Sequence, residues 1–259
     1  LGEVSFQLEP IAAALDYEQR LEREPLVLVV DIGGGTSDFT VVRLGPTHSG
    51  KHDRTGDILA TSGVHIGGTD FDHRLNVEQV MPLLGYRHIG PSGREVPSSV
   101  FFDLSTWHLI QWLYTPKAIA AARGLRTDYS NPQMHQRLLR VLEEREGHRL
   151  ADAVEQAKIG ASSSHGATPI DLHWLERGLD AQITPADLQL QLQALLANVV
   201  ACAQDCVRLA GVDKPDAIYL TGGSSALTAL RDALRQAFPD TPQVEGDLFG
   251  GVATGLAYA

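Results

Sequence analysis

The sequence predicts an α/β fold, and three observations support this. Apolar, β-branched runs typical of strands alternate with helical patterns, without any long repeat. Glycine pairs or triplets follow several of these strands, as in VLVVDIGGGTSD and DAIYLTGG. The 259 residues, with 43% hydrophobic and 20% charged content, suffice for one large domain or two smaller ones.

The charge and hydropathy of the chain exclude some kinds of partner. A formal net charge of -11 argues against sequence-independent binding to nucleic acid or to an anionic membrane, because either needs a basic surface. No apolar run approaches the roughly 20 residues that span a bilayer. The opening LGEVSFQLEP lacks the regions of a signal peptide. We therefore expect a cytoplasmic protein with no nucleic acid and no membrane among its partners.

The first elements are a helix and a hairpin. Residues 1–24 predict a loop and then a helix that has Glu9 and Pro10 in its first turn. Residues 27–45 predict two strands joined by a glycine tip, because the residues after the glycines favour a strand over a helix. Such a tip lets backbone N–H groups approach an anion and form a nest for phosphate oxygens. A flexible hairpin without a ligand is the alternative.

The middle of the chain gives weaker signals. Residues 57–64 predict a strand, and a helix begins at Thr69, with Asp72 at the spacing of a capping box, and runs to about Leu84. Residues 85–135 show no clear periodicity. Beyond them we expect a helical region over 132–161 and a short strand over 168–174.

The C-terminal part of the sequence gives clear signals for helices and a strand. Thr184 and Asp187 form a second capping box, which opens a helix that carries Cys202 and Cys206 on its apolar stripe. We interpret both thiols as core residues rather than a metal or redox pair, because no nearby Cys or His completes a ligand set. A strand DAIYLTGG, a helix SSALTALRDALRQAF and a final helix start FGGVATGLAYA follow.

Several segments have the chemistry of a phosphate site. The tip supplies backbone donors and the Thr36 hydroxyl for a terminal phosphate, while Asp31 is placed to hold a hydrated magnesium ion. LTGGSS at 220–225 ends a strand at glycines before a helix, which favours phosphate or ribose. VHIGGTDFD at 64–72 is by itself a strand-to-helix turn.

A further segment, EQAKIGAS, places four residues on one helical face at i, i+3, i+4 and i+7. These are Glu155, Lys158, Ile159 and Ser162. A solvated face is the ordinary alternative for such a stripe.

Taken in order, these motifs resemble the nucleotide-binding domain of the DnaK-type heat-shock chaperones, in the actin and sugar-kinase superfamily. The matching segments are EPIAAA, DIGGGTSD, HIGGTDFDHRL, EQAKIGASSS and LTGGSS, within roughly residues 5–80 and 150–259. The insert between them, which contains MPLLGY and two tryptophans, looks closest to the YegD-type chaperones.

The resemblance implies a binding site for ATP or ADP with magnesium held through water. Asp31 and Glu9 would order the magnesium-bound water, and Asp31 and Thr36 would serve catalysis. The nucleotide would be held by Gly33, Gly34, Gly35, Thr36, Glu155, Lys158, Ile159, Ser162, Gly222, Gly223 and Ser224. Ile159 and Ala226 stand where the family has arginines that stack on adenine, so the adenine preference stays open.

The resemblance also implies a domain organisation, that of the second lobe of an actin-like, ribonuclease H-like ATPase with an inserted α+β subdomain. Residues 1–24 would connect to a missing first lobe, 25–68 and 193–259 would form the ATPase subdomain, and 69–192 the insertion. The N-terminal lobe of the same protein would be a partner, together with unfolded polypeptide or co-chaperones. We expect ATP hydrolysis from the full-length protein and none from this chain alone.

Two rival functions remain at this point. A bacterial actin-like filament protein shares the DIGGGT hairpin and a closing glycine pair, and a sugar kinase of the same superfamily comes third. We also expect LTGGSS to lie close enough to DIGGGT for one nucleotide to bridge them. In the insert we expect Trp107, Trp112 and Tyr114 to cover a core rather than form an exposed patch.

Overall fold

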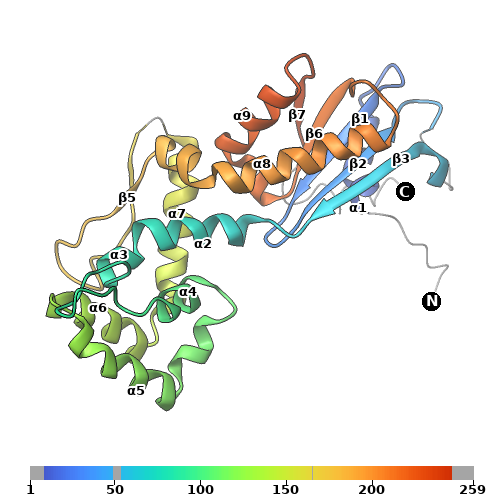
Figure 1. Ribbon diagram of the computed structural model, residues 1–259. Coiled ribbons are helices and arrows are strands. Elements are labelled where there is room, and N and C mark those ends of the chain that lie inside the picture. The colour runs from blue at the N-terminus through green and yellow to red at the C-terminus, as the bar shows by residue number, and fades with distance from the viewer. Residues whose placement is uncertain (1–8, 49–53, 165, 247–259) are drawn as a thin grey trace, which may run out of the picture. The chain divides into compact units, whose positions relative to one another are not determined.

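The computed structural model of the protein describes residues 9–48, 54–164 and 166–246. They fall into two compact units (Figure 1). Unit 1 comprises the described parts of Leu1–Gly68 and Ala194–Ala259, and unit 2 comprises those of Thr69–Gln193. Two helices, α2 (Gly68–Gln79) and α8 (Pro185–Leu209), contribute to both units.

Unit 1 is built on a mixed sheet. Besides its part of α8, its elements are α1 (Glu9–Glu18), β1 (Leu26–Ile32), β2 (Ser37–Arg43), η1 (Thr55–Asp57), β3 (Ile58–Val64), β6 (Ala217–Thr221), η4 (Gly223–Ala226), α9 (Thr228–Ala237) and β7 (Gln243–Glu245). The strand order in the described residues is β3-β2-β1-β6-β7. β1, β2 and β3 are antiparallel neighbours, and a four-residue tip joins β1 to β2. β6 is parallel to β1 and β7 to β6, with helices in the crossovers. The predicted α/β class is confirmed.

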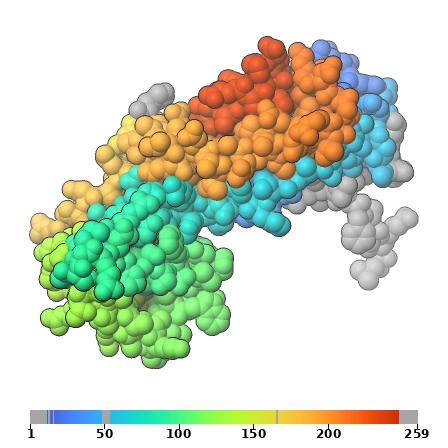
Figure 2. Space-filling view, in the orientation of Figure 1, coloured from blue at the N-terminus to red at the C-terminus, as the bar shows by residue number. Residues whose placement is uncertain are grey.

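The two faces of the sheet are covered by different helices, because alternate residues of a strand point to opposite sides. Val27 and Val29 lie in one buried cluster with Tyr219, against which α1 places the ring of Tyr17 at 5.3 Å. On the other face, the fully buried Cys206 of α8 places its Sγ 3.5 Å from the Phe39 carbonyl oxygen. The outer surfaces of α8 and α9 form the orange and red part of unit 1 in Figure 2.

The helix α8 carries both cysteines, and the expectation of a packed thiol is confirmed at Cys206. Burial raises the pKa of the Cys206 thiol, whereas Cys202 is half-buried. By length and composition, α8 is also the one helix among the described residues that could cross a membrane. This is weak evidence, since the core helix of a water-exposed domain passes the same test.

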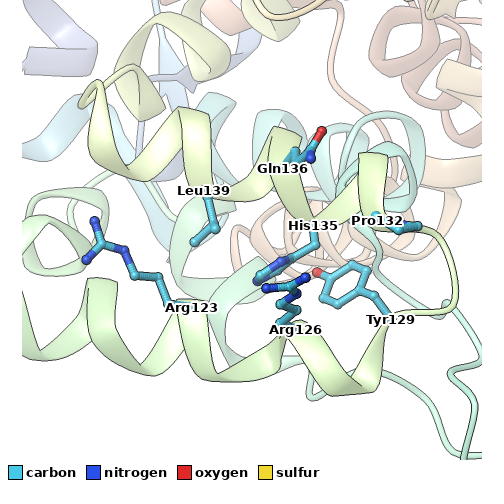
Figure 3. A pocket seen from close by; sticks show the side chains of 7 residues that line it. All are labelled: Arg123, Arg126, Tyr129, Pro132, His135, Gln136 and Leu139. Atoms are coloured by element: carbon cyan, nitrogen blue, oxygen red, sulfur yellow. The ribbon is translucent and has the colours of Figure 1, made fainter.

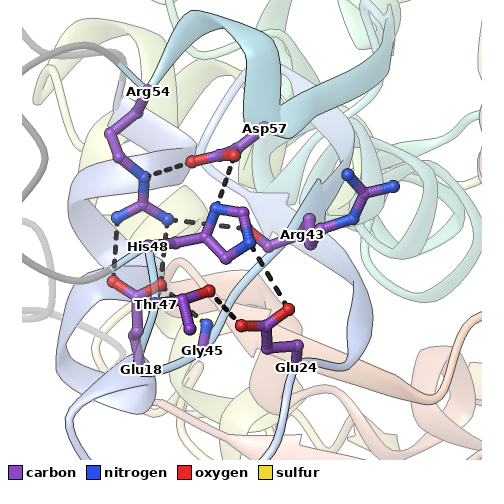
Figure 4. A network of polar contacts seen from close by, with 8 residues as sticks. All are labelled: Glu18, Glu24, Arg43, Gly45, Thr47, His48, Arg54 and Asp57. Atoms are coloured by element: carbon purple, nitrogen blue, oxygen red, sulfur yellow. Dashed lines mark hydrogen bonds and ion pairs between the residues drawn. The ribbon is translucent and has the colours of Figure 1, made fainter.

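A buried polar network lies at the end of the sheet away from the hairpin tip (Figure 4). The Arg54 guanidinium donates to both carboxylate oxygens of Glu18, at 2.8 and 2.9 Å, and to Asp57 at 2.6 Å. Glu18 also accepts from the Gly45 N–H at 2.9 Å. His48 Nδ1 lies 2.7 Å from the other oxygen of Asp57. The network therefore ties α1 to the connection between β2 and β3.

Unit 2 is mostly helical, with a small two-stranded sheet. Besides its parts of α2 and α8, it contains α3 (Met81–Leu84), α4 (Ser99–Ser105), η2 (Ile110–Tyr114), α5 (Pro116–Gly124), η3 (Leu125–Asp128), α6 (Pro132–Glu143), α7 (Gly147–Ser163), β4 (Thr168–Pro169) and β5 (Gln182–Ile183). β4 and β5 are antiparallel. Thr184 and Asp187 make the predicted capping box, with bonds of 2.9 and 3.1 Å between each backbone N–H and the other side chain.

Several expected boundaries were wrong. The helical region expected over 132–161 is two helices, separated by a turn in which Arg145 has a φ of 59°. The strand expected over 168–174 is limited to Thr168–Pro169. Helix α2 begins before Thr69, and α9 begins at Thr228 after a 3-10 turn. The helix expected near the C-terminus lies outside the described residues.

The expectation that the insert's tryptophans cover a core was also wrong. Trp107 is 61% exposed and Trp112 is 65% exposed. The core of this region is instead made of smaller apolar residues, including Phe101, Leu104 and Ile110. Trp107 lies in the turn after α4, and Trp112 lies in η2, where Ile110 and Leu113 are the buried residues.

Candidate functional site

The hairpin tip is the four-residue connection between β1 and β2. Ile32 and Ser37 are register partners, so the tip consists of Gly33, Gly34, Gly35 and Thr36. The Gly33 N–H donates to the Thr36 carbonyl at 3.0 Å and closes the turn. Both flanking residues are fully buried, whereas the last three tip residues are exposed. A rigid sheet thus presents an accessible backbone loop.

The turn before α2 lies directly against this tip. The Gly68 N–H donates to the Gly33 carbonyl at 3.0 Å. A Cβ on Gly67 would lie 2.6 Å from the carbonyl atoms of Gly34, closer than real Cβ contacts come. A side chain on Gly68 would meet the Ser224 hydroxyl. Both glycines are therefore required by close packing.

The segment after β6 also meets this tip. The Ser224 hydroxyl donates to the Gly33 carbonyl at 3.1 Å. Gly222 has a φ of 79°, and a Cβ there would lie 2.5 Å from Asp31 Oδ1. The structure therefore brings together Asp31, the tip residues and Gly222–Ser224, and the expected closeness of LTGGSS and DIGGGT is observed.

Gly34 and Gly35 differ from these packed glycines. A Cβ built on either meets no atom within 4 Å, and neither has a positive φ. Nothing in the packing of the described residues therefore explains why these positions are glycine. A loop without Cβ atoms lets a ligand approach its backbone N–H groups.

Two carboxylates flank the tip. Asp31 and Asp38 are register partners on adjacent antiparallel strands, so their side chains leave the same face of the sheet. The Thr36 hydroxyl donates to Asp38 at 2.9 Å. Asp38 was not among the predicted site residues, although it belongs to the DIGGGTSD motif. The side chain of Glu9, the other predicted acidic residue, lies outside the described part of the chain.

A metal ion at the tip would depend on few protein ligands. In the described residues, no three His, Cys, Asp or Glu side chains gather as a metal site. Asp31 and Asp38 supply carboxylate oxygens, the ligand type that Mg²⁺ prefers, and Mg²⁺ commonly keeps several waters. The residues present thus fit a hydrated ion rather than a protein cage.

The four residues predicted on EQAKIGAS lie on α7 in unit 2 and are not part of the unit 1 cluster. Glu155 and Ile159 are exposed, whereas Lys158 and Ser162 are buried, so the solvated-face alternative holds for two of the four. Lys158 Nζ lies 2.8 Å from Asp72 of α2. Sequence reasoning had given Asp72 to a helix cap and missed this pair.

The pair is held in a poorly solvated place. Burial raises the pKa of Asp72 to about 6, because desolvation outweighs the attraction of the Lys158 ammonium, and the charge of Glu155 adds to the rise. The Lys158 ammonium therefore pairs with the Asp72 carboxylate of α2. A ligand of Lys158 would have to compete with Asp72.

Comparison with known proteins relates this part of the chain to chaperones. The Hsp70 protein family model matches residues 8–81, which contain α1, the hairpin tip and the Gly67–Gly68 turn. The chaperone protein dnaK of Guillardia theta is 26% identical over 90% of the chain. These similarities support a DnaK-type nucleotide-binding domain. The actin-like filament alternative is not favoured.

Further Hsp70 relatives extend over the parts that the family model leaves out. Chaperone protein DnaK 3 of Synechococcus is 28% identical over 96% of the chain, and an HscA homolog of Pseudomonas fluorescens is 27% identical over 96%. These alignments cover 30% to 32% of the relatives, so the chain spans about a third of their length. A special closeness to YegD-type members of the Hsp70 family stays a prediction.

Proposed function

We propose that this chain binds ATP or ADP at the hairpin tip, as part of the nucleotide-binding domain of a DnaK-type chaperone ATPase. The observation that carries the proposal is the open space above Gly34 and Gly35. The packed turns at Gly67 and Gly222 hold the loop in place, while Gly34 and Gly35 leave open space where a Cβ would stand. Phosphate oxygens fit such a loop.

The proposed roles in unit 1 are those that the resemblance to DnaK-type chaperones implies. Gly33, Gly34, Gly35 and the Thr36 hydroxyl take the β- and γ-phosphates. Gly222, Gly223 and Ser224 take the α-phosphate and ribose. Asp31, with Glu9, orders water on a magnesium ion, and Asp38 orients Thr36 through their hydrogen bond. When bound, magnesium would neutralise phosphate charge.

The roles proposed for α7 are more limited. Glu155 and Ile159 are exposed and can contact ribose and adenine, whereas Lys158 and Ser162 act from buried positions. Ile159 offers an apolar contact without the cation–π stacking of an arginine. We infer weak selection for adenine.

The partners extend beyond this chain, which spans about a third of its relatives' length. We propose that residues 1–24 connect to an N-terminal lobe, that 25–68 and 193–259 form the ATPase subdomain, and that 69–192 are its insertion. Unfolded polypeptide and co-chaperones are the proposed further partners, in the cytoplasm. The net charge of -11 argues against nucleic acid and anionic membranes as partners.

The decisive experiment substitutes the two open glycines. Gly34→Ala and Gly35→Ala each add a methyl group where the phosphates would lie, so we expect the affinity for Mg-ADP, measured by calorimetry, to fall at least about tenfold. The free energy of unfolding should change by no more than about 0.5 kcal/mol, because the added methyl group meets nothing.

Gly56→Ala is the matched control. Gly56 also has open space around a built Cβ, and it lies in the connection before β3 at the opposite end of the sheet. This variant should bind as the parent chain does. Unchanged affinity in both tip variants would refute the proposed phosphate site.

A further inference from the structure

Unit 2 contains a cavity that the proposed nucleotide site does not use (Figure 3). Its volume is about 620 Å³, within the range of roughly 300 to 1,000 Å³ of small-molecule sites. It lies between α5 with η3 on one side and α6 on the other. The lining residues are Arg123, Arg126, Tyr129, Pro132, His135, Gln136 and Leu139.

The inner wall of the cavity is aromatic and largely apolar. Tyr129 and His135 are both buried, and their ring centroids are 4.9 Å apart. One polar atom of each ring already has a partner: the Tyr129 hydroxyl donates to the Leu84 carbonyl at 2.9 Å, and His135 Nε2 lies 2.9 Å from the Ala122 carbonyl. The rings therefore offer mainly their faces and edges to a ligand.

Two guanidinium groups stand at the rim. Arg126 and Arg123 line the same cavity as His135 and Tyr129 (Figure 3). Within the part of the chain that the structure describes, the Arg126 side chain makes no hydrogen bond or ion pair. Arg123 donates through Nε to Glu143 at 2.8 Å, which leaves its other N–H groups. Free guanidinium N–H donors beside an aromatic wall can bind a planar molecule that carries a carboxylate group.

The local charge decides which kind of anion fits. Glu143 pairs with Arg123, and Asp128 is next to Tyr129 in the chain, so two carboxylates offset the two arginines. No net positive charge is left for a polyphosphate. One carboxylate can still take two parallel hydrogen bonds from Arg126, because that interaction depends on geometry as much as on net charge.

We propose that this cavity binds a small planar carboxylate, with its flat apolar body against Tyr129, His135 and Leu139 and its carboxylate on Arg126. The site is separate from the hairpin tip, and neither the fold nor the proposed ATPase function requires it. It would make unit 2 a receptor for a small metabolite-sized acid.

Fluorine NMR with para-fluorobenzoate tests this on the chain itself. We expect saturable binding at about 1 mM or tighter. Arg126→Gln should weaken binding at least about tenfold, through loss of a charge-assisted, bidentate contact. Arg126 is exposed, so the variant should fold normally. Arg94→Gln removes another exposed arginine of unit 2, outside the cavity, and should bind as the parent does.

Two further probes complete the test. Para-fluorobenzamide has the same shape without the charge and should bind at least about tenfold more weakly than the benzoate. Phenyl phosphate should bind no more tightly than the benzoate, because the site has no net positive charge. Absent benzoate binding, equal binding of the amide, tighter binding of the phosphate, or an Arg126→Gln variant with parental affinity would each overturn the proposal.

Discussion

Glycines in this protein serve two different purposes, which can be separated residue by residue. Gly67, Gly68 and Gly222 are glycine because backbone or side-chain atoms occupy the place of a Cβ. Gly34 and Gly35 have empty space there. From the sequence, DIGGGT and HIGG look alike as glycine clusters, and spacing alone cannot tell packing from ligand access. The distinction needs the positions of atoms that are distant in the chain.

The burial and the partners of charged residues also depend on atoms that are distant in the chain. The sequence pointed to Lys158 and Glu155 as neighbours on one helical face, which the local period of a helix fixes. It could not show that Lys158 is buried and paired with Asp72, because that pair joins two helices far apart in the chain. The capping box expected of Thr69 and Asp72 was wrong because α2 begins at Gly68, before Thr69.

Asp72 gives a prediction about pH. Its folded-state pKa of about 6 lies above the ordinary 3.8, so the folded protein holds this proton more tightly than the unfolded chain does. The resulting stabilisation is fully present below pH 3.8 and is lost as the pH rises through about 6. As the pH rises from 3.8 to above about 6, the parent should thus lose about 1 to 3 kcal/mol of unfolding free energy relative to Asp72→Asn.

Urea unfolding of both proteins across this pH range measures the difference. Asp152→Asn is the control, because Asp152 is an exposed aspartate on α7. Its difference from the parent should stay flat with pH. A flat difference for Asp72→Asn as well would contradict the raised pKa.

At the scale of elements, the Glu18–Arg54–Asp57 network fixes α1 to the sheet. Arg54→Met leaves two buried carboxylates without their cation, so we expect a loss of about 3 to 5 kcal/mol in unfolding free energy. Pairing it with Glu18→Leu removes one of those charges and should recover part of the loss. Chemical unfolding of the single and double variants measures both effects.

Arg235→Met is the matched control for this experiment. Arg235 pairs with Asp232 on the exposed side of α9, and a surface pair of this kind contributes about 0.5 kcal/mol or less. An Arg54→Met variant as stable as this control would show that the buried network does not hold α1 in place.

The turn before α2 gives a second prediction at this scale. Gly67→Ala would force a Cβ to within 2.6 Å of the Gly34 carbonyl, so the turn and the hairpin tip must move apart. We expect a loss of about 1 to 3 kcal/mol, seen as a lower thermal midpoint, where Gly34→Ala has almost no effect. Equal thermal midpoints for these two variants would contradict the close contact.

Elements differed in how well the sequence predicted them. The strands β1, β2, β3 and β6 and the helix α8 were predictable because each is a regular apolar pattern bounded by glycine, proline or a capping box. Residues 85–135 form helices and 3-10 turns of four to nine residues. Segments this short present too few core positions to establish a period, so the exposed Trp107 and Trp112 could not be foreseen.

On the scale of the whole molecule, the chain spans about a third of its Hsp70 relatives. Phosphoryl transfer requires charge stabilisation around the phosphates as well as positioning. We expect this chain alone to release phosphate from Mg-ATP at least about a hundredfold more slowly than the full-length protein. A phosphate-release assay on both, with full-length Thr36→Ala as a further sample, measures this. Comparable turnover by the chain alone would contradict the expectation.

The distribution of tryptophans has a spectroscopic consequence. All three, Trp107, Trp112 and Trp174, lie in unit 2. Collisional quenchers should reach the two exposed indoles in the folded protein. The Arg149 guanidinium carbon lies 4.7 Å from the ring centre of Trp174. The loss of this contact should dominate the change in emission on unfolding. Unit 1 instead has the stacked rings of Tyr17 and Tyr219. Indole emission therefore follows the melting of unit 2 alone, in an unlabelled sample.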